Sequence, residues 1–125
     1  MAQVKALIGN IKGKDGMANV YSTSETVIGT WNGSTLYRKM IKVNIPNTTA
    51  DGTCALGTYS TGISYVKIKS VYLNEISVNN YVWSTAGMND RRTIIVYAGD
   101  TNVFIENYGK LNNGKSCYIV IEYIK

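Results

Sequence analysis

The chain is rich in side-chain types that recognise sugars. It has ten tyrosines and two tryptophans. An aromatic ring can stack on a sugar while neighbouring amides and carboxylates hydrogen-bond its hydroxyls. One expected loop brings these types together, since it is flanked by Tyr81, Trp83, Asn89, Asp90 and Arg91. These five residues are the predicted ligand-binding site, and the alternative for Trp83 is an ordinary place in the core of a sheet protein.

Catalytic chemistry has less support. The chain has no histidine, which removes the commonest general base and every Ser-His or Cys-His nucleophile. A carboxylate pair could hydrolyse a glycosidic bond, and Asp90, Asp100 and Glu106 fall near expected loops or a strand. Nothing in the sequence fixes their separation, so solvated surface carboxylates are the simpler interpretation. We therefore expect a protein that is not an enzyme.

Metal ions and cofactors are not expected either. Asp51, Asp90 and Asp100 could offer oxygen ligands to calcium, but they lack EF-hand-like spacing. Cys54 and Cys117 are too few for a disulfide scaffold or a metal set. Buried free thiols are the expectation, although a sequence leaves open whether the two approach within bonding distance.

The net charge of +5, from 13 Lys and Arg against 8 Asp and Glu, is moderate. A patch of Arg91, Arg92, Lys67 and Lys69 could attract single-stranded nucleic acid or, equally, anionic wall polymers. No RNA-recognition or helix-turn-helix signature is present, so nucleic acid is not an expected partner. No apolar run approaches the roughly 18 residues of a membrane span, and residues 1–12 lack the apolar stretch of a secretory signal. We expect cytosolic synthesis and no membrane insertion.

The elements that position these residues are expected to be strands, because apolar residues alternate with period two and no amphipathic helix pattern occurs. The clearest is a hairpin of residues 25–31 and 35–45 joined by Asn32-Gly33, which tolerates the positive φ angles of a type I′ turn. Trp31, in the first strand, is expected in the core. The residues of the second strand expected to point inward are Ile41, Val43 and Ile45.

Turn signals recur about every ten residues along the rest of the chain. Pro46 ends the hairpin, and a polar loop is expected to about Gly62. The further expected strands are 64–70, 71–78, 81–83 and a closing meander of 93–97, 102–107 and 116–124. Eight or nine short strands predict an all-β fold, an antiparallel β-sandwich of the jelly-roll kind, with an oligonucleotide-binding type of barrel as the alternative.

Residues 1–19 differ from the rest. Their segment 9–16 is glycine-rich and charged, which predicts an N-terminal arm or linker leading into a sandwich domain of residues 20–125. Gly13 and Gly16 have collagen spacing, so a trimer-forming stub is the alternative.

The hairpin region resembles a known family. Residues 21–33, YSTSETVIGTWNG, followed by LYRK at 36–39, resemble a block that recurs in bacteriophage virion fibre proteins. There, Tyr-Ser-Thr-x-Glu precedes Val/Ile-Gly-x-Trp, a glycine turn and Leu/Ile-Tyr-x-Lys. Residues 45–49, 62–64 and the closing strands are similar to the segments that follow in that family. Two surface segments depart from it, because Ser34-Thr35 stands where the family usually has Lys-Pro, and residues 50–59 form a longer loop.

The resemblance implies a tail-fibre or head-fibre tip domain, made in the bacterial cytoplasm, displayed on the virion and commonly a homotrimer. The expected partners are other copies of the chain, other virion proteins and a host-surface polysaccharide. Three weak sites per fibre and many fibres per particle would attach it by avidity. The alternative is a capsid decoration, head-fibre or baseplate protein without its own ligand, whose aromatic residues bury subunit contacts.

Overall fold

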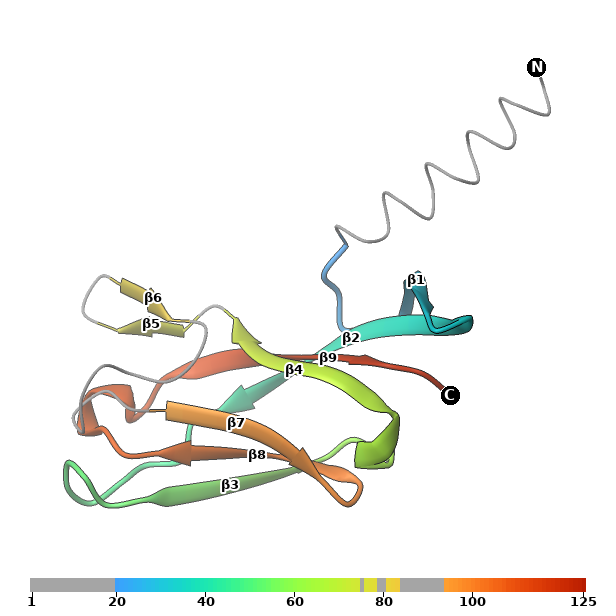
Figure 1. The fold of residues 1–125 in the computed structure, drawn as a ribbon. Helices are drawn as coiled ribbons and strands as arrows, with labels where there is room; N and C mark the ends of the chain where they lie inside the picture. Colours follow the sequence, from blue (N-terminus) through green and yellow to red (C-terminus); the bar gives the residue numbers. More distant parts are fainter. Residues whose placement is uncertain (1–19, 75, 79–80, 84–93) are drawn as a thin grey trace.

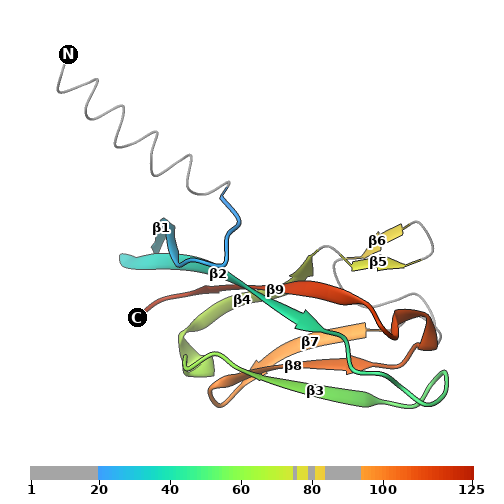
Figure 2. The ribbon, with the colours of Figure 1, turned by 180° about the vertical axis from the view of Figure 1, so that it is seen from behind.

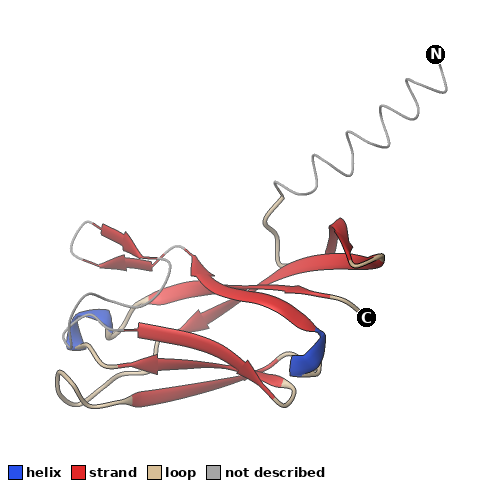
Figure 3. Cartoon of the chain, viewed as in Figure 1, coloured by secondary structure: helices blue, strands red, loops and turns tan. Residues whose placement is uncertain are grey.

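The structure, a computed structural model, describes residues 20–74, 76–78, 81–83 and 94–125, with 76–78 and 81–83 described for their backbone alone. The predicted arm of residues 1–19 lies outside this part of the chain. The described part holds nine strands, two short 3-10 turns and no α-helix (Figure 3). The strands are β1 Thr26–Trp31, β2 Ser34–Asn44, β3 Ala55–Ser60, β4 Ile68–Asn74, β5 Ile76–Val78, β6 Tyr81–Trp83, β7 Ile94–Gly99, β8 Asn102–Asn107 and β9 Ser116–Tyr123. The turns are η1 Tyr65–Lys67 and η2 Lys110–Asn112.

Two antiparallel sheets form the fold and confirm the predicted β-sandwich. The larger sheet has the strand order β1-β2-β9-β4 and the smaller the order β3-β8-β7, while β5 and β6 pair as a separate ribbon. Figures 1 and 2 show the two sheets as layers, with the hairpin of β1 and β2 extending beyond the end of the smaller sheet. Every strand pair is antiparallel.

The core lies between the sheets and consists mainly of β-branched residues, which suit a pleated surface. Its fully buried members from β4, β9, β7 and β8 are Leu73, Ile119, Ile121, Ile94, Val103 and Ile105. The prediction for the second hairpin strand is confirmed, because Val43 and Ile45 are buried and Ile41 packs against them.

The predicted hairpin is also confirmed. Asn32 and Gly33 take φ angles of 46° and 83°, as a type I′ turn requires. Trp31 was expected in the core, and this prediction is wrong, since the residue is 44% exposed. The hairpin end projects past the smaller sheet (Figure 1), so no second layer covers it. The ammonium of Lys69 lies 5.7 Å from the ring centroid.

Three expectations about the remaining strands are wrong. The expected polar loop of residues 50–62 contains β3, whose Ala55 to Ser60 pair with β8. The expected strand 64–70 begins as the turn η1 and becomes extended only at Ile68. Finally, β9 does not continue the meander beside β8 but crosses to the larger sheet between β2 and β4. Val120 is buried on the face of β9 opposite Ile119 and Ile121, so a central position between two strands buries β9 best.

A network of buried amides ties the ends of the smaller sheet to the loop that leaves β2. Asn107 is fully buried, and its Nδ2 donates to the carbonyl of Pro46 at 2.8 Å and to Asn113 Oδ1 at 3.1 Å. Its Oδ1 accepts the backbone N–H of Gly109 at 3.0 Å and the Nδ2 of Asn112 at 2.9 Å. Every hydrogen-bonding position of this amide is therefore used.

We expect Asn107→Ala to lower the free energy of unfolding by about 2 kcal/mol, because several buried groups lose their partner at once. Urea unfolding at fixed protein concentration measures the change. Asn102→Ala, at the other end of the same strand, is the matched control and should change stability by less than about 0.5 kcal/mol. Equal effects of the two substitutions would contradict the role given to the network.

The two cysteines lie in different environments and both are free. The prediction of a buried thiol is confirmed for Cys117 and wrong for Cys54, which is exposed in the loop before β3. Burial raises the pKa of the Cys117 thiol from 9.0 to about 12. The protonated thiol therefore makes its full contribution to folding stability at pH values below its usual pKa. This contribution is lost as the pH rises toward about 12.

A thiol-reactive disulfide reagent at neutral pH should modify one cysteine per folded chain rapidly and the second only in denaturant, because the thiolate is the reactive form. Cys54→Ser should abolish the fast phase, and Cys117→Ser should leave it unchanged. Two fast thiols in the folded wild-type chain would contradict the burial of Cys117.

Candidate functional site

Of the five residues of the sequence-predicted site, the structure describes only Tyr81 and Trp83. Tyr81 and Trp83 belong to β6, where they pair with Val78 and Ile76 of β5. The remaining three, Asn89, Asp90 and Arg91, lie outside the described residues. This site stays a prediction.

An aromatic surface occupies the outer face of the smaller sheet. The strand register places Leu56, Glu106 and Ile95 in one cross-strand row and Thr58, Phe104 and Tyr97 in the next. These residues alternate with the buried positions of β7 and β8, so they point away from the core. We call this surface the Tyr97 face, and its members are Leu56, Ile95, Tyr97, Phe104, Glu106 and Tyr108.

The rings of Tyr97 and Phe104 stack on this face, with centroids 5.2 Å apart and planes 25° apart. Tyr97 is 37% exposed, although an amphipathic ring of this size is usually more buried. Leu56 and Ile95 are exposed as well, at 56% and 37%. The face therefore offers an apolar surface held on a rigid sheet.

A carboxylate lies within this apolar surface. Glu106 accepts hydrogen bonds from the hydroxyl of Tyr97 at 2.6 Å and from that of Tyr108 at 2.5 Å. These bonds, first that of Tyr108 and then that of Tyr97, hold the pKa of Glu106 below its usual value. The same contacts raise the pKa of both tyrosines. At neutral pH the carboxylate is therefore ionised, and each oxygen keeps a lone pair that can accept a further donor.

This geometry suits binding of a polyhydroxylated ligand, because an apolar sugar face can stack on a ring while its hydroxyls donate to the carboxylate. It does not suit a hydrolytic pair of Asp100 and Glu106. Asp100 lies in the turn before β8, and Asn102 to Glu106 alone spans roughly 13 Å of extended strand. The carboxylate separations that glycosidases use are smaller, at most about 9.5 Å.

The sequence contained part of the signal for the Tyr97 face. Phe104 and Glu106 share the outer face of a strand whose range was predicted as 102–107, and an aromatic residue on that face is unusual enough to be noticed. From the sequence, Glu106 is expected to be either a catalytic acid or a solvated surface carboxylate. The cross-strand neighbours of Phe104 and Glu106 on β3 could not be predicted, because the sequence predicts a loop there and therefore no strand partner for β8 on that side.

A second polar cluster lies on the outer face of the larger sheet. Arg38, buried there, donates from Nε and Nη2 to Glu122 Oε2 at 2.8 and 2.7 Å. Tyr72 donates to the same oxygen at 3.1 Å. The Arg38 guanidinium also lies 4.2 Å from the ring centroid of Tyr21 and donates to the carbonyl of Val20 at 3.3 Å. The cluster fixes the segment before β1 to the sheet, which is a structural role.

In the described part of the chain, no group of three or more His, Cys, Asp or Glu side chains could hold a metal ion. That part also has no helix with the length and apolar character needed to cross a membrane. Compared with family models, with curated proteins and with solved structures, the chain matches none of them.

Proposed function

We propose that this chain is a non-enzymatic attachment domain at a fibre tip of a bacteriophage particle, and that it binds a host-surface glycan through the Tyr97 face. The observation that carries the glycan part is an exposed ring beside an ionised carboxylate with vacant lone pairs. The resemblance of residues 21–39 to virion fibre proteins supports the location on the particle.

Avidity is the proposed mechanism of attachment. A flat sheet face holds a sugar weakly, because only one side of the ligand loses contact with water. A homotrimer on each of several fibres would raise the effective concentration of every further contact. The proposed partners are copies of the chain, other virion proteins and the host polysaccharide, after synthesis in the bacterial cytoplasm.

A structural role without a ligand is the second candidate, as in a capsid decoration, head-fibre or baseplate protein. Leu56 and Ile95 favour it, because apolar side chains this exposed on one sheet face also suit a subunit contact. The two functions require different states of the Tyr97 face. Glycan attachment requires the face to be exposed to solvent, whereas the structural role requires it to be covered by another subunit.

Light scattering on the full chain, combined with a panel of bacterial capsule and lipopolysaccharide glycans, separates the two candidates. Attachment predicts a trimer, three times the 13.8 kDa chain mass, that binds at least one glycan. Leu56→Asp should then leave the trimer intact. A trimer that binds nothing on the panel and dissociates in Leu56→Asp would instead support the structural role.

A further inference from the structure

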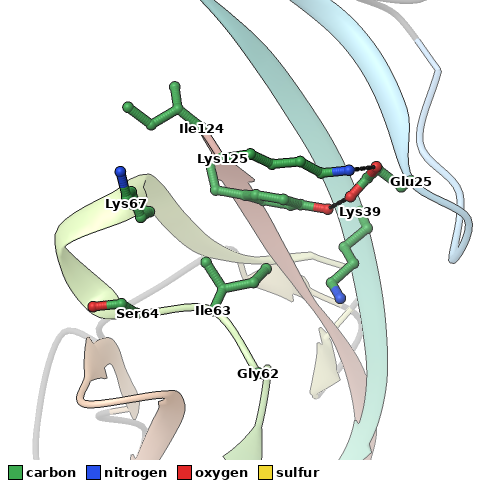
Figure 4. Close-up of a pocket in the computed structure, with 9 residues that line it drawn as sticks. Glu25, Lys39, Gly62, Ile63, Ser64, Lys67, Ile124 and Lys125 are labelled. Atoms are coloured by element: carbon green, nitrogen blue, oxygen red, sulfur yellow. Dashed lines mark hydrogen bonds and ion pairs between the residues drawn. The ribbon is translucent and has the colours of Figure 1, made fainter.

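A pocket of about 340 Å³ lies where the end of β9 meets the connection between β3 and β4. Figure 4 shows Lys67 and Ser64 on one side of it and Glu25 and Lys39 on the other, with Ile63 between them. The complete lining is Glu25, Lys39, Gly62, Ile63, Ser64, Lys67, Tyr123, Ile124 and Lys125.

The walls of the pocket are fixed by backbone hydrogen bonds. The N–H groups of Thr61 and Gly62 donate to the carbonyl of Thr101 at 2.9 and 3.3 Å, and that of Tyr65 donates to Asp100 at 2.7 Å. On the other wall, the N–H of Ile124 donates to the carbonyl of Lys67 at 3.0 Å. The pocket is therefore preformed, and a ligand need not order the loop.

The charge of the pocket is positive, because three lysines and one glutamate line it. Lys125 already uses its ammonium, which lies 2.8 Å from Glu25 Oε1. The other oxygen of Glu25 accepts the hydroxyl of Tyr123. These bonds, first that of Lys125 and then that of Tyr123, lower the pKa of Glu25. The Glu25 carboxylate is therefore ionised, and both of its oxygens already have a partner.

Lys39 and Lys67 form no direct ion pair with a carboxylate among the described residues, although the charge of Lys39 helps to lower the pKa of Glu25. Lys39 lies on the inward face of β2, in line with Tyr37 and Ile41. The larger sheet extends past the smaller one (Figure 1). Lys39 therefore lines the pocket and not the core, which explains a lysine on the inward face. Its ammonium lies 5.9 Å from the ring centroid of Tyr123.

The pocket also has groups for a neutral part of a ligand. Ile63 and Ile124 provide apolar surface, and Ser64 provides a hydroxyl. A volume of about 340 Å³ is at the small end of ligand sites. This combination matches one carboxylate or phosphate attached to a short chain or ring of hydroxylated carbons.

We propose that this pocket binds an anionic polyol, with Lys39 and Lys67 attracting its carboxylate or phosphate from opposite sides and Ser64 bonded to a hydroxyl. A sugar acid and a glycerol phosphate unit share this chemistry. The pocket has no residue in common with the Tyr97 face, so this site does not depend on the proposed function. It adds a preference for acidic ligands to a chain of net charge +5.

Calorimetric titration of the full chain with D-glucuronate, with glycerol 3-phosphate and with glucose tests the site. At least one of the two anions should bind, with an affinity that falls as salt is added, and glucose should not. The anion that binds identifies the source as a uronate or a phosphate polymer. Any purification tag belongs at the N-terminus, because Lys125 lines the pocket.

Substitutions that each remove one positive charge test whether the anion binds in this pocket. Lys39→Gln and Lys67→Gln should each raise the Kd about three- to fivefold, and Lys67→Arg should restore it. Lys110→Gln removes the same charge from an exposed position outside the pocket and should have no effect. Circular dichroism verifies that each variant is folded.

The site would be overturned if neither anion binds, if glucose binds the Tyr97→Ala variant as tightly as the anions do, or if Lys110→Gln weakens binding as much as Lys67→Gln. If a Tyr97 variant no longer binds the glycan found on the panel but binds the anion as wild type does, the pocket and the Tyr97 face are separate sites. These outcomes distinguish a failure of the pocket from a failure of the proposed function.

Discussion

Arg38→Ala should lower the free energy of unfolding by about 3 to 5 kcal/mol, the range measured when one partner of a buried ion pair is removed. The side chains of Arg38 and Glu122 are only 8% and 16% exposed. Without the guanidinium, the Glu122 carboxylate keeps the hydroxyl of Tyr72 and loses two charge-assisted hydrogen bonds. The segment before β1 also loses the contacts of Arg38 with Tyr21 and Val20.

Urea unfolding followed by circular dichroism measures this change, at a fixed protein concentration because an oligomer's stability depends on it. The double variant Arg38→Met, Glu122→Leu is the matched control. It leaves no buried charge, so it should recover most of the lost stability. A single variant within about 0.5 kcal/mol of wild type, or a double variant no more stable than the single one, would contradict the assignment.

Tyr97→Ala should abolish attachment to a glycan-coated surface. One chain is expected to lose about tenfold in affinity for a stacked sugar, because the ring and its bond to Glu106 are both removed. In a trimer with all three sites engaged, the losses multiply toward about a thousandfold. Surface plasmon resonance on a sparse and on a dense coat of the bound glycan measures the two values.

Two variants control for this effect. Tyr65→Ala removes a tyrosine that is 52% exposed in η1, away from the smaller sheet's outer face, and should leave neutral-glycan binding unchanged. Tyr97→Phe keeps the ring and loses only the hydroxyl bond to Glu106, so its loss should be intermediate. If Tyr65→Ala costs as much as Tyr97→Ala, the Tyr97 face is not the binding surface.

The local parts of the fold could be predicted from the sequence because their signals lie within a few residues. Asn32-Gly33 determines the hairpin turn, and period-two alternation determines the inward residues Val43 and Ile45. The partner of β9 could not be predicted in this way. Consecutive strands usually neighbour one another, and only the burial of Val120 as well as Ile119 indicates a central strand in the other sheet.

The candidate site was harder to predict for the same reason. Tyr81 and Trp83 lie near polar residues in the sequence, and this proximity predicts a site there. The members of the Tyr97 face come from β3, β7, β8 and the loop after β8. The predicted ranges of two of the three strands are nearly correct, but β3 follows a polar run and its short sequence, ALGTYS, has no apolar residues alternating with polar ones. Its pairing with β8 is a long-range contact that no local pattern specifies.

The most direct test of the account is an amide NMR titration of the isotope-labelled full chain with a glycan that it binds on the panel. Binding at the Tyr97 face predicts chemical-shift changes at residues 56–58, 95–97 and 104–108, with the strands on the larger sheet unaffected. Changes confined to residues 81–91 would locate the glycan at the sequence-predicted site and would contradict the role proposed for Tyr97, Phe104 and Glu106.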